Sequence, residues 1–221
     1  MRRTAAFLVL FAAAMAFVEA AVVVYLRRVL GEVEIFPMKD LPPPLLAIEI
    51  AREAATIAML LAVSLLSVRG GIRRMGAFLL TFAAWDVFYY LWLYVVIGWP
   101  AGIGEWDILF LIPAPWVGPV WSVLLLCAGM IAFAALFLRA PEKAPFSPGR
   151  WGWATGVAGL VAIVGSYVRE WVKIGYGKGV PVDFSVLPFL AGLALLGVSG
   201  WLTYRRIVWI PAGAGRDRLT V

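Results

Sequence analysis

Acidic side chains lie inside three long apolar stretches of this sequence, where ionisable groups are rare. Glu19 lies in the first stretch, Glu49 and Glu53 flank Arg52 in the second, and Asp86 lies in the third. An ionised group in an apolar environment is costly unless it is paired or neutralised, so each of these residues is a candidate functional group. Carboxyl groups in such places carry protons, hold hard cations, bind organic cations or act as general acids.

Helical periodicity places the acids of the second stretch on one face. Glu49 and Glu53 are four residues apart and share that face with Thr56 and Ser64, while Arg52 borders it. Two structural alternatives stay open. Glu49 could reach water from the end of its helix, and an ion pair with Arg52 could do no more than fix the helix register.

The third stretch has a polar face and an apolar face. Neither Asp86 on the polar face nor Glu19 has a basic residue within one turn of its own helix, which favours a functional role for both. Helical spacing puts Tyr89, Tyr90 and Tyr94 on the polar face and Trp85, Phe88 and Trp92 on the apolar face. The economical arrangement turns the acids of the first three helices toward each other, with the arginine and the tyrosine hydroxyls as partners, in a pocket that opens outward. The predicted ligand-binding or proton-binding residues are Glu19, Glu49, Arg52, Glu53, Asp86, Tyr89 and Tyr90.

The composition is that of an integral membrane protein. The chain has 221 residues, of which 63% are hydrophobic and 14% charged, and its mean hydropathy is +0.93. A soluble domain is nearer half apolar and a quarter charged. We predict an all-α transmembrane bundle that forms a single membrane domain over residues 1–221, because six stretches reach the roughly 20 residues that a span requires. These spans are 5–26, 45–67, 75–97, 116–138, 151–172 and 184–204.

The segment 98–115 is expected to cap the pocket. Its apolar run 108–112 is too short to cross a bilayer and is followed by prolines, so we predict an interfacial or re-entrant segment. Trp99, Glu105 and Asp107 are the candidate cap residues. The alternative is a plain belt of interfacial aromatic residues with a loop.

The basic residues predict the orientation. If the N-terminus is cytoplasmic, that side holds Arg2, Arg3, Arg69, Arg73, Arg74, Arg139, Lys143, Arg150, Arg205, Arg206, Arg216 and Arg218. The segment 98–115 has no basic residue, so we predict that both termini are cytoplasmic and that this is a multi-pass protein of a bacterial inner membrane. The net charge of +6 then reflects topology, and we expect the lipid bilayer rather than nucleic acid as partner.

The residue types exclude several kinds of chemistry. Histidine is absent and cysteine occurs once, at Cys127, which we interpret as a packing residue. The usual ligand sets for zinc, copper and haem iron are missing, so we expect no metal and no cofactor.

At the end of the fifth stretch, Arg169, Glu170 and Lys173 are interpreted as a solvated helix end. The glycines of the last two stretches predict close packing between these two stretches.

Three segments of the sequence resemble a group of small bacterial membrane proteins. They are WDVFYYLW at 85–92, WDILFLIP at 106–113 and EIAREAATIAMLL at 49–61, and the resemblance extends over roughly the first 125 residues. That group is uncharacterised. The resemblance therefore implies a six-span fold and no activity.

Three classes of function stay open. A binding or transport protein would capture a proton, a cation, or a small cationic or lipidic ligand in the outer pocket. An enzyme would use Glu19, Glu53 or Asp86 as an acid or base on a lipid or isoprenoid. A scaffold or accessory subunit predicts fully paired acids and no cavity. The inner halves of the first three helices are almost wholly apolar, which favours a one-sided binding pocket over a pore.

Overall fold

The computed structural model describes residues 1–29, 36, 42–175 and 179–208, and this part of the chain is mostly helical. Six helices make up 76% of it. They are α1 (Arg2–Val29), α2 (Pro43–Ser67), α3 (Gly71–Ile97), α4 (Val120–Phe137), α5 (Gly149–Ile174) and α6 (Val186–Val208). Arg216 and Arg218, which entered the charge count for the orientation, lie outside the described residues.

Five of the helices, α1, α3, α4, α5 and α6, are long and apolar enough to cross a membrane. This indicates a helical protein embedded in a membrane, as the composition predicts. α2 is not among the five, and its first half carries Glu49, Arg52 and Glu53. α1 extends beyond the predicted range 5–26 at both ends, since arginine is a good helix former and continues the helix at each end.

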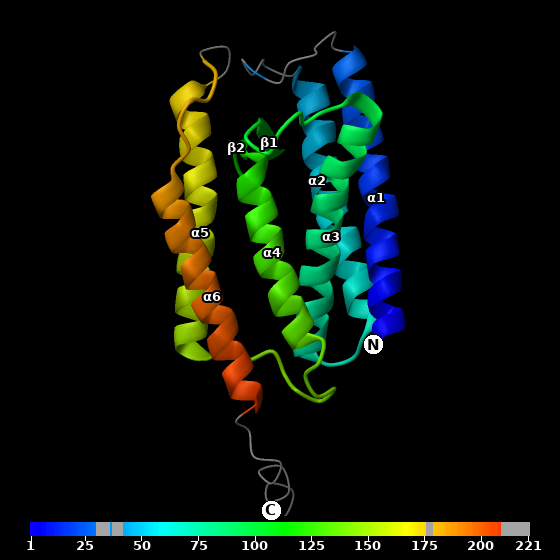
Figure 1. Cartoon of the computed structure of the whole chain (residues 1–221), viewed down its shortest axis with the longest axis vertical. Helices are drawn as coiled ribbons and strands as arrows, with labels where there is room; N and C mark the ends of the chain where they lie inside the picture. Colours follow the sequence, from blue (N-terminus) through cyan, green and yellow to red (C-terminus); the bar gives the residue numbers. More distant parts are fainter. Residues whose placement is uncertain (30–35, 37–41, 176–178, 209–221) are drawn as a thin grey trace, which may run out of the picture.

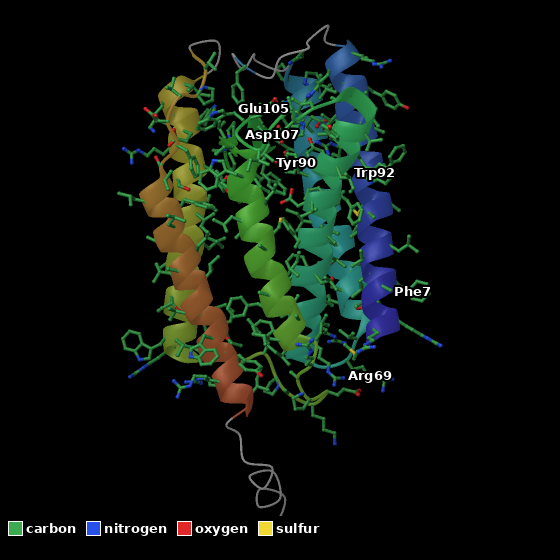
Figure 2. All side chains as sticks on the ribbon, viewed as in Figure 1. Phe7, Arg69, Tyr90, Trp92, Glu105 and Asp107 are labelled. Atoms are coloured by element: carbon green, nitrogen blue, oxygen red, sulfur yellow. The ribbon has the colours of Figure 1, made fainter. Side chains whose placement is uncertain are left out.

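The helices form two groups that meet through a β-hairpin and through α4 (Figure 1). α3 packs against α1, α2 and α4, while α5 and α6 pack along each other. α5 contacts β2 (Trp116–Pro119) of the hairpin, and α6 contacts α4. The N-terminus and the end of α6 lie at one end of the bundle, and the hairpin lies toward the other, which we call the hairpin end (Figure 1). Glu105 and Asp107 lie at the hairpin end, whereas Arg69 lies at the opposite end (Figure 2).

The hairpin replaces the interfacial or re-entrant segment that the sequence predicts. β1 (Trp106–Phe110) and β2 (Trp116–Pro119) pair in antiparallel fashion, with Asp107 opposite Gly118. The predicted all-α class therefore omits the hairpin. The helix predicted over 116–138 begins at Val120, as α4. Proline has no backbone N–H and cannot continue a helix, and Pro119 ends the second strand immediately before α4.

The hairpin packs directly on α5 because β2 contains a glycine at the contact. A Cβ atom on Gly118 would lie 2.5 Å from Cε1 of the Tyr167 ring. Only a residue without a side chain fits there, so Gly118 sets the distance between the hairpin and α5. Through this contact the α5 and α6 pair is held next to the first four helices.

At the end of α5, Arg169 and Lys173 are exposed, as the interpretation of a solvated helix end predicts, but Glu170 is buried, which corrects that interpretation for the carboxylate. Glu170 is 2% exposed and accepts hydrogen bonds from the backbone N–H of Ser185 at 3.0 Å and from Nζ of Lys173 at 2.7 Å. Ser185 immediately precedes α6, so the carboxylate satisfies an N–H group at the start of that helix. Farther along, α5 and α6 pack closely, as predicted, and a Cβ on Gly159 would lie 2.8 Å from the Gly192 carbonyl oxygen.

Candidate functional site

A cavity of about 720 Å³ extends from the hairpin end into the bundle. All six described helices and the hairpin contribute to its wall. Its ionisable and tyrosine residues are Glu19, Arg27, Glu49, Arg52, Glu53, Asp86, Tyr89, Tyr90, Asp107 and Tyr167. Every residue that the sequence predicts for ligand or proton binding is therefore part of one wall.

Glu19, Glu49 and Arg52 form an ion-pair cluster between α1 and α2. The Arg52 guanidinium donates to Oε2 of Glu49 from Nε at 3.0 Å and from Nη2 at 2.7 Å, and it also pairs with Glu19. Thr56 donates its hydroxyl hydrogen to Glu19. Both glutamates are buried, at 5% and 6% exposed, so Glu49 does not reach water as one alternative allowed. The sequence predicts that Arg52 neutralises one acid, and in the structure it pairs with two, Glu19 and Glu49.

Glu53 links α2 to the hairpin. Its two carboxylate oxygens accept the backbone N–H of Leu111 at 3.0 and 2.9 Å. Leu111 follows β1, where the chain leaves the strand, so the N–H is free of the strand ladder. The carboxylate therefore satisfies a buried backbone donor and holds the hairpin against α2.

Asp107 enters the wall from β1 and is 4% exposed. It accepts a hydrogen bond from the Tyr90 hydroxyl at 3.1 Å. Burial raises the pKa of Asp107 to about 6, against the opposing effects of Arg27, the Tyr90 hydroxyl and the Ile108 N–H. This tyrosine thus donates to a hairpin carboxyl group and not to a helix carboxyl group, which the sequence did not anticipate.

Like Glu53 and Asp107, Asp86 forms no ion pair with a basic side chain among the described residues. The group that donates to it is the thiol of Cys127 on α4, with 3.6 Å between Sγ and Oδ2. Cys127 is 1% exposed and packs among apolar residues, as predicted, but it also meets this carboxyl group. Asp86 keeps some accessible surface although it lies deep in the bundle, because it faces the cavity.

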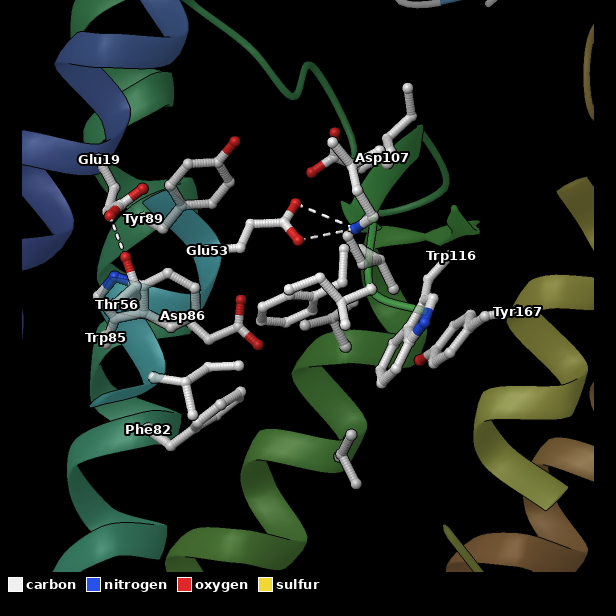
Figure 3. A pocket seen from close by; sticks show the side chains of 18 of the residues that line it. Glu19, Glu53, Thr56, Phe82, Trp85, Asp86, Tyr89, Asp107, Trp116 and Tyr167 are labelled. Carbon is white, nitrogen blue, oxygen red and sulfur yellow. Dashed lines mark hydrogen bonds between the residues drawn. The ribbon is translucent and has the colours of Figure 1, made fainter. Parts of the chain in front are cut away.

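Three carboxyl groups converge on one space from three elements. Figure 3 shows the carboxyl groups of Glu53 on α2, Asp86 on α3 and Asp107 on β1 pointing into the cavity. Glu19 instead points toward Thr56 at the side of the cavity (Figure 3). Glu19 and Glu49 are therefore held by Arg52, whereas the three converging carboxyl groups face the cavity without an ion pair among the described residues.

Aromatic rings surround this space. Phe82 lies 5.5 Å from Trp85 between ring centroids, Phe110 lies 5.4 Å from Trp116, and Trp116 stacks on Tyr167 at 6.2 Å. Trp85 is 7% exposed and lines the cavity, whereas Tyr94 is 58% exposed, so the predicted polar and apolar faces of α3 are wrong at these two positions. Tyr167 was missed because it comes from α5, far from the acids in sequence, whereas Trp116 follows the predicted cap segment.

The three candidate cap residues have different positions. Asp107 lines the cavity, together with the rest of the stretch from Ile108 to Ile112. Trp99 is not among the lining residues and lies beneath the Arg27 guanidinium, 4.6 Å from its ring centroid. Glu105 is also outside the wall and accepts the backbone N–H of Ala101 at 2.8 Å, which stabilises the loop before β1.

Away from the hairpin end the wall is apolar. Phe78 lies eight residues before Asp86 on α3, which places it about 12 Å deeper at 1.5 Å per residue. The residues that share this apolar part are Ile57, Phe78, Leu79, Leu126, Met130, Leu160, Ile163 and Leu196. In the part of the chain that the structure describes, no cluster of acidic, histidine and cysteine residues could hold a metal ion. The wall therefore suits a molecule with a polar head and an apolar tail.

Comparison with known proteins gives no relative from which to transfer a role. No family model matches this chain, and no curated protein or solved structure matches it. The function is therefore inferred from the cavity and its residues.

Proposed function

We propose that this protein crosses a bacterial inner membrane six times, with both termini in the cytoplasm, and binds an amphiphilic ligand in the outer half of the bilayer. The shared position of the N-terminus and the end of α6 supports an even number of crossings (Figure 1). The arginine-rich turn that holds Arg69, Arg73 and Arg74 lies at that same end and supports its cytoplasmic location. The hairpin end then faces outward.

The observation that carries this proposal is the division of one cavity into an acidic end and an apolar end. Five carboxyl groups and two arginines line it, so acceptors exceed charged donors at the hairpin end. A ligand head that carries positive charge or donates hydrogen bonds, such as an amine or a hydroxyl group, complements Glu53, Asp86 and Asp107. The apolar part of the wall receives the rest of the molecule.

Two other classes of function have less support. A scaffold needs no cavity and requires every acid to be paired, whereas Asp86 forms no ion pair among the described residues. A transporter needs a polar path to the opposite end. In that direction, the hydroxyl groups of Ser64 and Thr81 are buried and bond to each other at 2.9 Å, and the cavity wall is apolar.

Acid-base catalysis on the bound molecule is the second candidate. The convergence of Glu53, Asp86 and Asp107 beside an apolar wall favours it, since a carboxyl group next to a lipid or isoprenoid chain can donate or accept a proton there. Incubation of the protein with a bound lipid in D₂O tests this function. Deuterium incorporation that depends on Asp86 would support catalysis, and recovery of unchanged lipid would leave binding alone.

Native mass spectrometry of the purified protein tests the binding function. We expect a retained amphiphile in the wild type and less of it in Asp86→Asn and Glu53→Gln, because each change alters the acceptors that face the head. Glu170→Gln is the control, since Glu170 is also a buried glutamate but lies outside the cavity. A wild type without any retained amphiphile, or cavity variants that retain as much as the wild type, would contradict the proposal.

A further inference from the structure

We infer that the ligand is a single-chain lipid that enters the cavity sideways from the bilayer, between α2 and α5. This inference rests on the proposed binding function and adds the class of ligand and its route. The sequence alone predicts a pocket that opens outward. Three features of the described residues point instead to the side of the bundle.

The first feature is the part of the cavity wall between α2 and α5. α2 and α5 both line the cavity, through Ile57 and Leu160, but the two helices do not pack along each other. Leu160 is a cavity residue and is nevertheless 55% exposed. It lies near the middle of the 26-residue helix α5, about 17 Å from its start at 1.5 Å per residue, and so at the depth of lipid chains.

The second feature is the cover at the hairpin end. The stretch from Asp107 to Ile112 lines the cavity there, and the two hydrogen bonds from Leu111 to Glu53 fix it to α2. The loop before β1 is fixed to the start of α4, where Val120 and Trp121 donate backbone N–H groups to the carbonyl oxygens of Glu105 and Ile103 at 2.9 and 2.8 Å. The described hairpin thus lies between the cavity and the outer face.

The third feature is the size of the cavity. A group the size of a water molecule occupies about 30 Å³ in the liquid, so 720 Å³ holds about 24 groups of that size. One hydrocarbon chain with a small head fits this volume. A fatty or isoprenoid amine or alcohol, or a sphingoid-type base, has the required shape and head.

The bilayer that surrounds the protein determines which part of the lipid contributes to its affinity for the cavity. A lipid tail gains little by moving from other lipid tails to an apolar wall, because both surroundings are apolar. Selectivity must therefore come from the head among Glu53, Asp86 and Asp107, and from the limited volume. Long-chain and medium-chain amines should differ little in affinity, whereas removal of the amine should abolish binding.

Capture of a C18 primary amine by protein in lipid nanodiscs tests the route. Leu160→Trp fills the opening from α5 and Ile57→Trp fills it from α2, and we expect each to slow capture by about tenfold. Val161→Trp is the matched control, because Val161 is 64% exposed on the same helix but does not line the cavity. The unfolding temperature of each variant checks that the fold is intact, and the two blocking variants on different helices guard against failure of one of them.

The possible results separate the two proposals. A wild type that retains an amphiphile on purification but captures no C18 amine would overturn the ligand class alone, and one that retains no amphiphile and captures no amine would overturn the binding function itself. A wild type that captures the amine, with both blocking variants equally fast, would overturn the lateral route alone. Equal binding of a water-soluble C6 amine added to the solution, or of a two-chain lipid with an amine head, would overturn the assignment to a single-chain lipid of the bilayer.

Discussion

The contact of Gly118 with Tyr167 gives the sharpest test of how the hairpin is positioned. A Cβ atom at residue 118 would lie 2.5 Å from Cε1 and 2.6 Å from Cδ1 of the ring, well inside van der Waals contact. Tyr167 cannot retreat easily, since it is 1% exposed, stacks on Trp116 and donates its hydroxyl hydrogen to Ser122 at 3.0 Å. Gly118→Ala must therefore push β2 away from α5.

Overpacking of this kind costs about 1 to 3 kcal/mol in well-packed interiors. For a chain of 221 residues this corresponds to an unfolding temperature lower by about 2 to 12 °C. The assay is thermal unfolding in detergent, read by intrinsic tryptophan fluorescence. The displaced hairpin also loosens one wall of the cavity, so we expect weaker retention of the amphiphile in the same variant.

Gly104→Ala is the control for this substitution. Gly104 lies in the loop before β1, and a Cβ atom there would meet nothing within 4 Å. We expect this variant to unfold at the wild-type temperature. If Gly118→Ala also unfolds at the wild-type temperature, the hairpin is not packed on α5 as described.

Three further predictions concern single side chains. The pKa of Asp107 is raised on folding, so the folded protein binds the proton more tightly, and the free energy of unfolding should fall by up to about 3 kcal/mol as the pH rises from about 4 to about 6. The same series of denaturation measurements on Asp107→Asn should lack this fall. A fall in Asp107→Asn as large as in the wild type would refute the prediction. Tyr90→Phe removes the donor to Asp107 and should lower the free energy of unfolding, measured with a chemical denaturant, by about 1 kcal/mol, whereas Tyr94→Phe, at an exposed position, should leave it unchanged. Equal effects of the two substitutions would contradict the hydrogen bond. Glu170→Gln should lower the unfolding temperature without reducing ligand retention, because it weakens the contact with Lys173 outside the cavity. A loss of ligand would contradict this prediction and show that the end of α5 is coupled to the cavity.

The helix faces could be predicted from sequence where a period of 3.6 residues governs burial. Glu49, Glu53, Thr56 and Ser64 are buried on one face of α2, as their spacing predicts. Asp86 likewise lines the same cavity as the acids of the other helices. These residues were identified because an acid in an apolar helix is a strong local signal.

The remaining parts of the site depend on contacts between distant segments, which local patterns do not encode. The hairpin was missed because its second strand, Trp116–Pro119, continues without a break into an apolar helix. The partner of Glu53 is a backbone N–H at Leu111, and backbone groups carry no sequence signature. Glu170 was misread because its partner Ser185 lies 15 residues away, at the end of the next loop.

A density map of the protein in lipid nanodiscs tests the central claim most directly. The account predicts one elongated feature in the cavity, with its head among Glu53, Asp86 and Asp107 and its tail running past Leu160 toward the gap between α2 and α5. A cavity that holds only separate water peaks, or one closed by movement of α5 onto α2, would contradict the account.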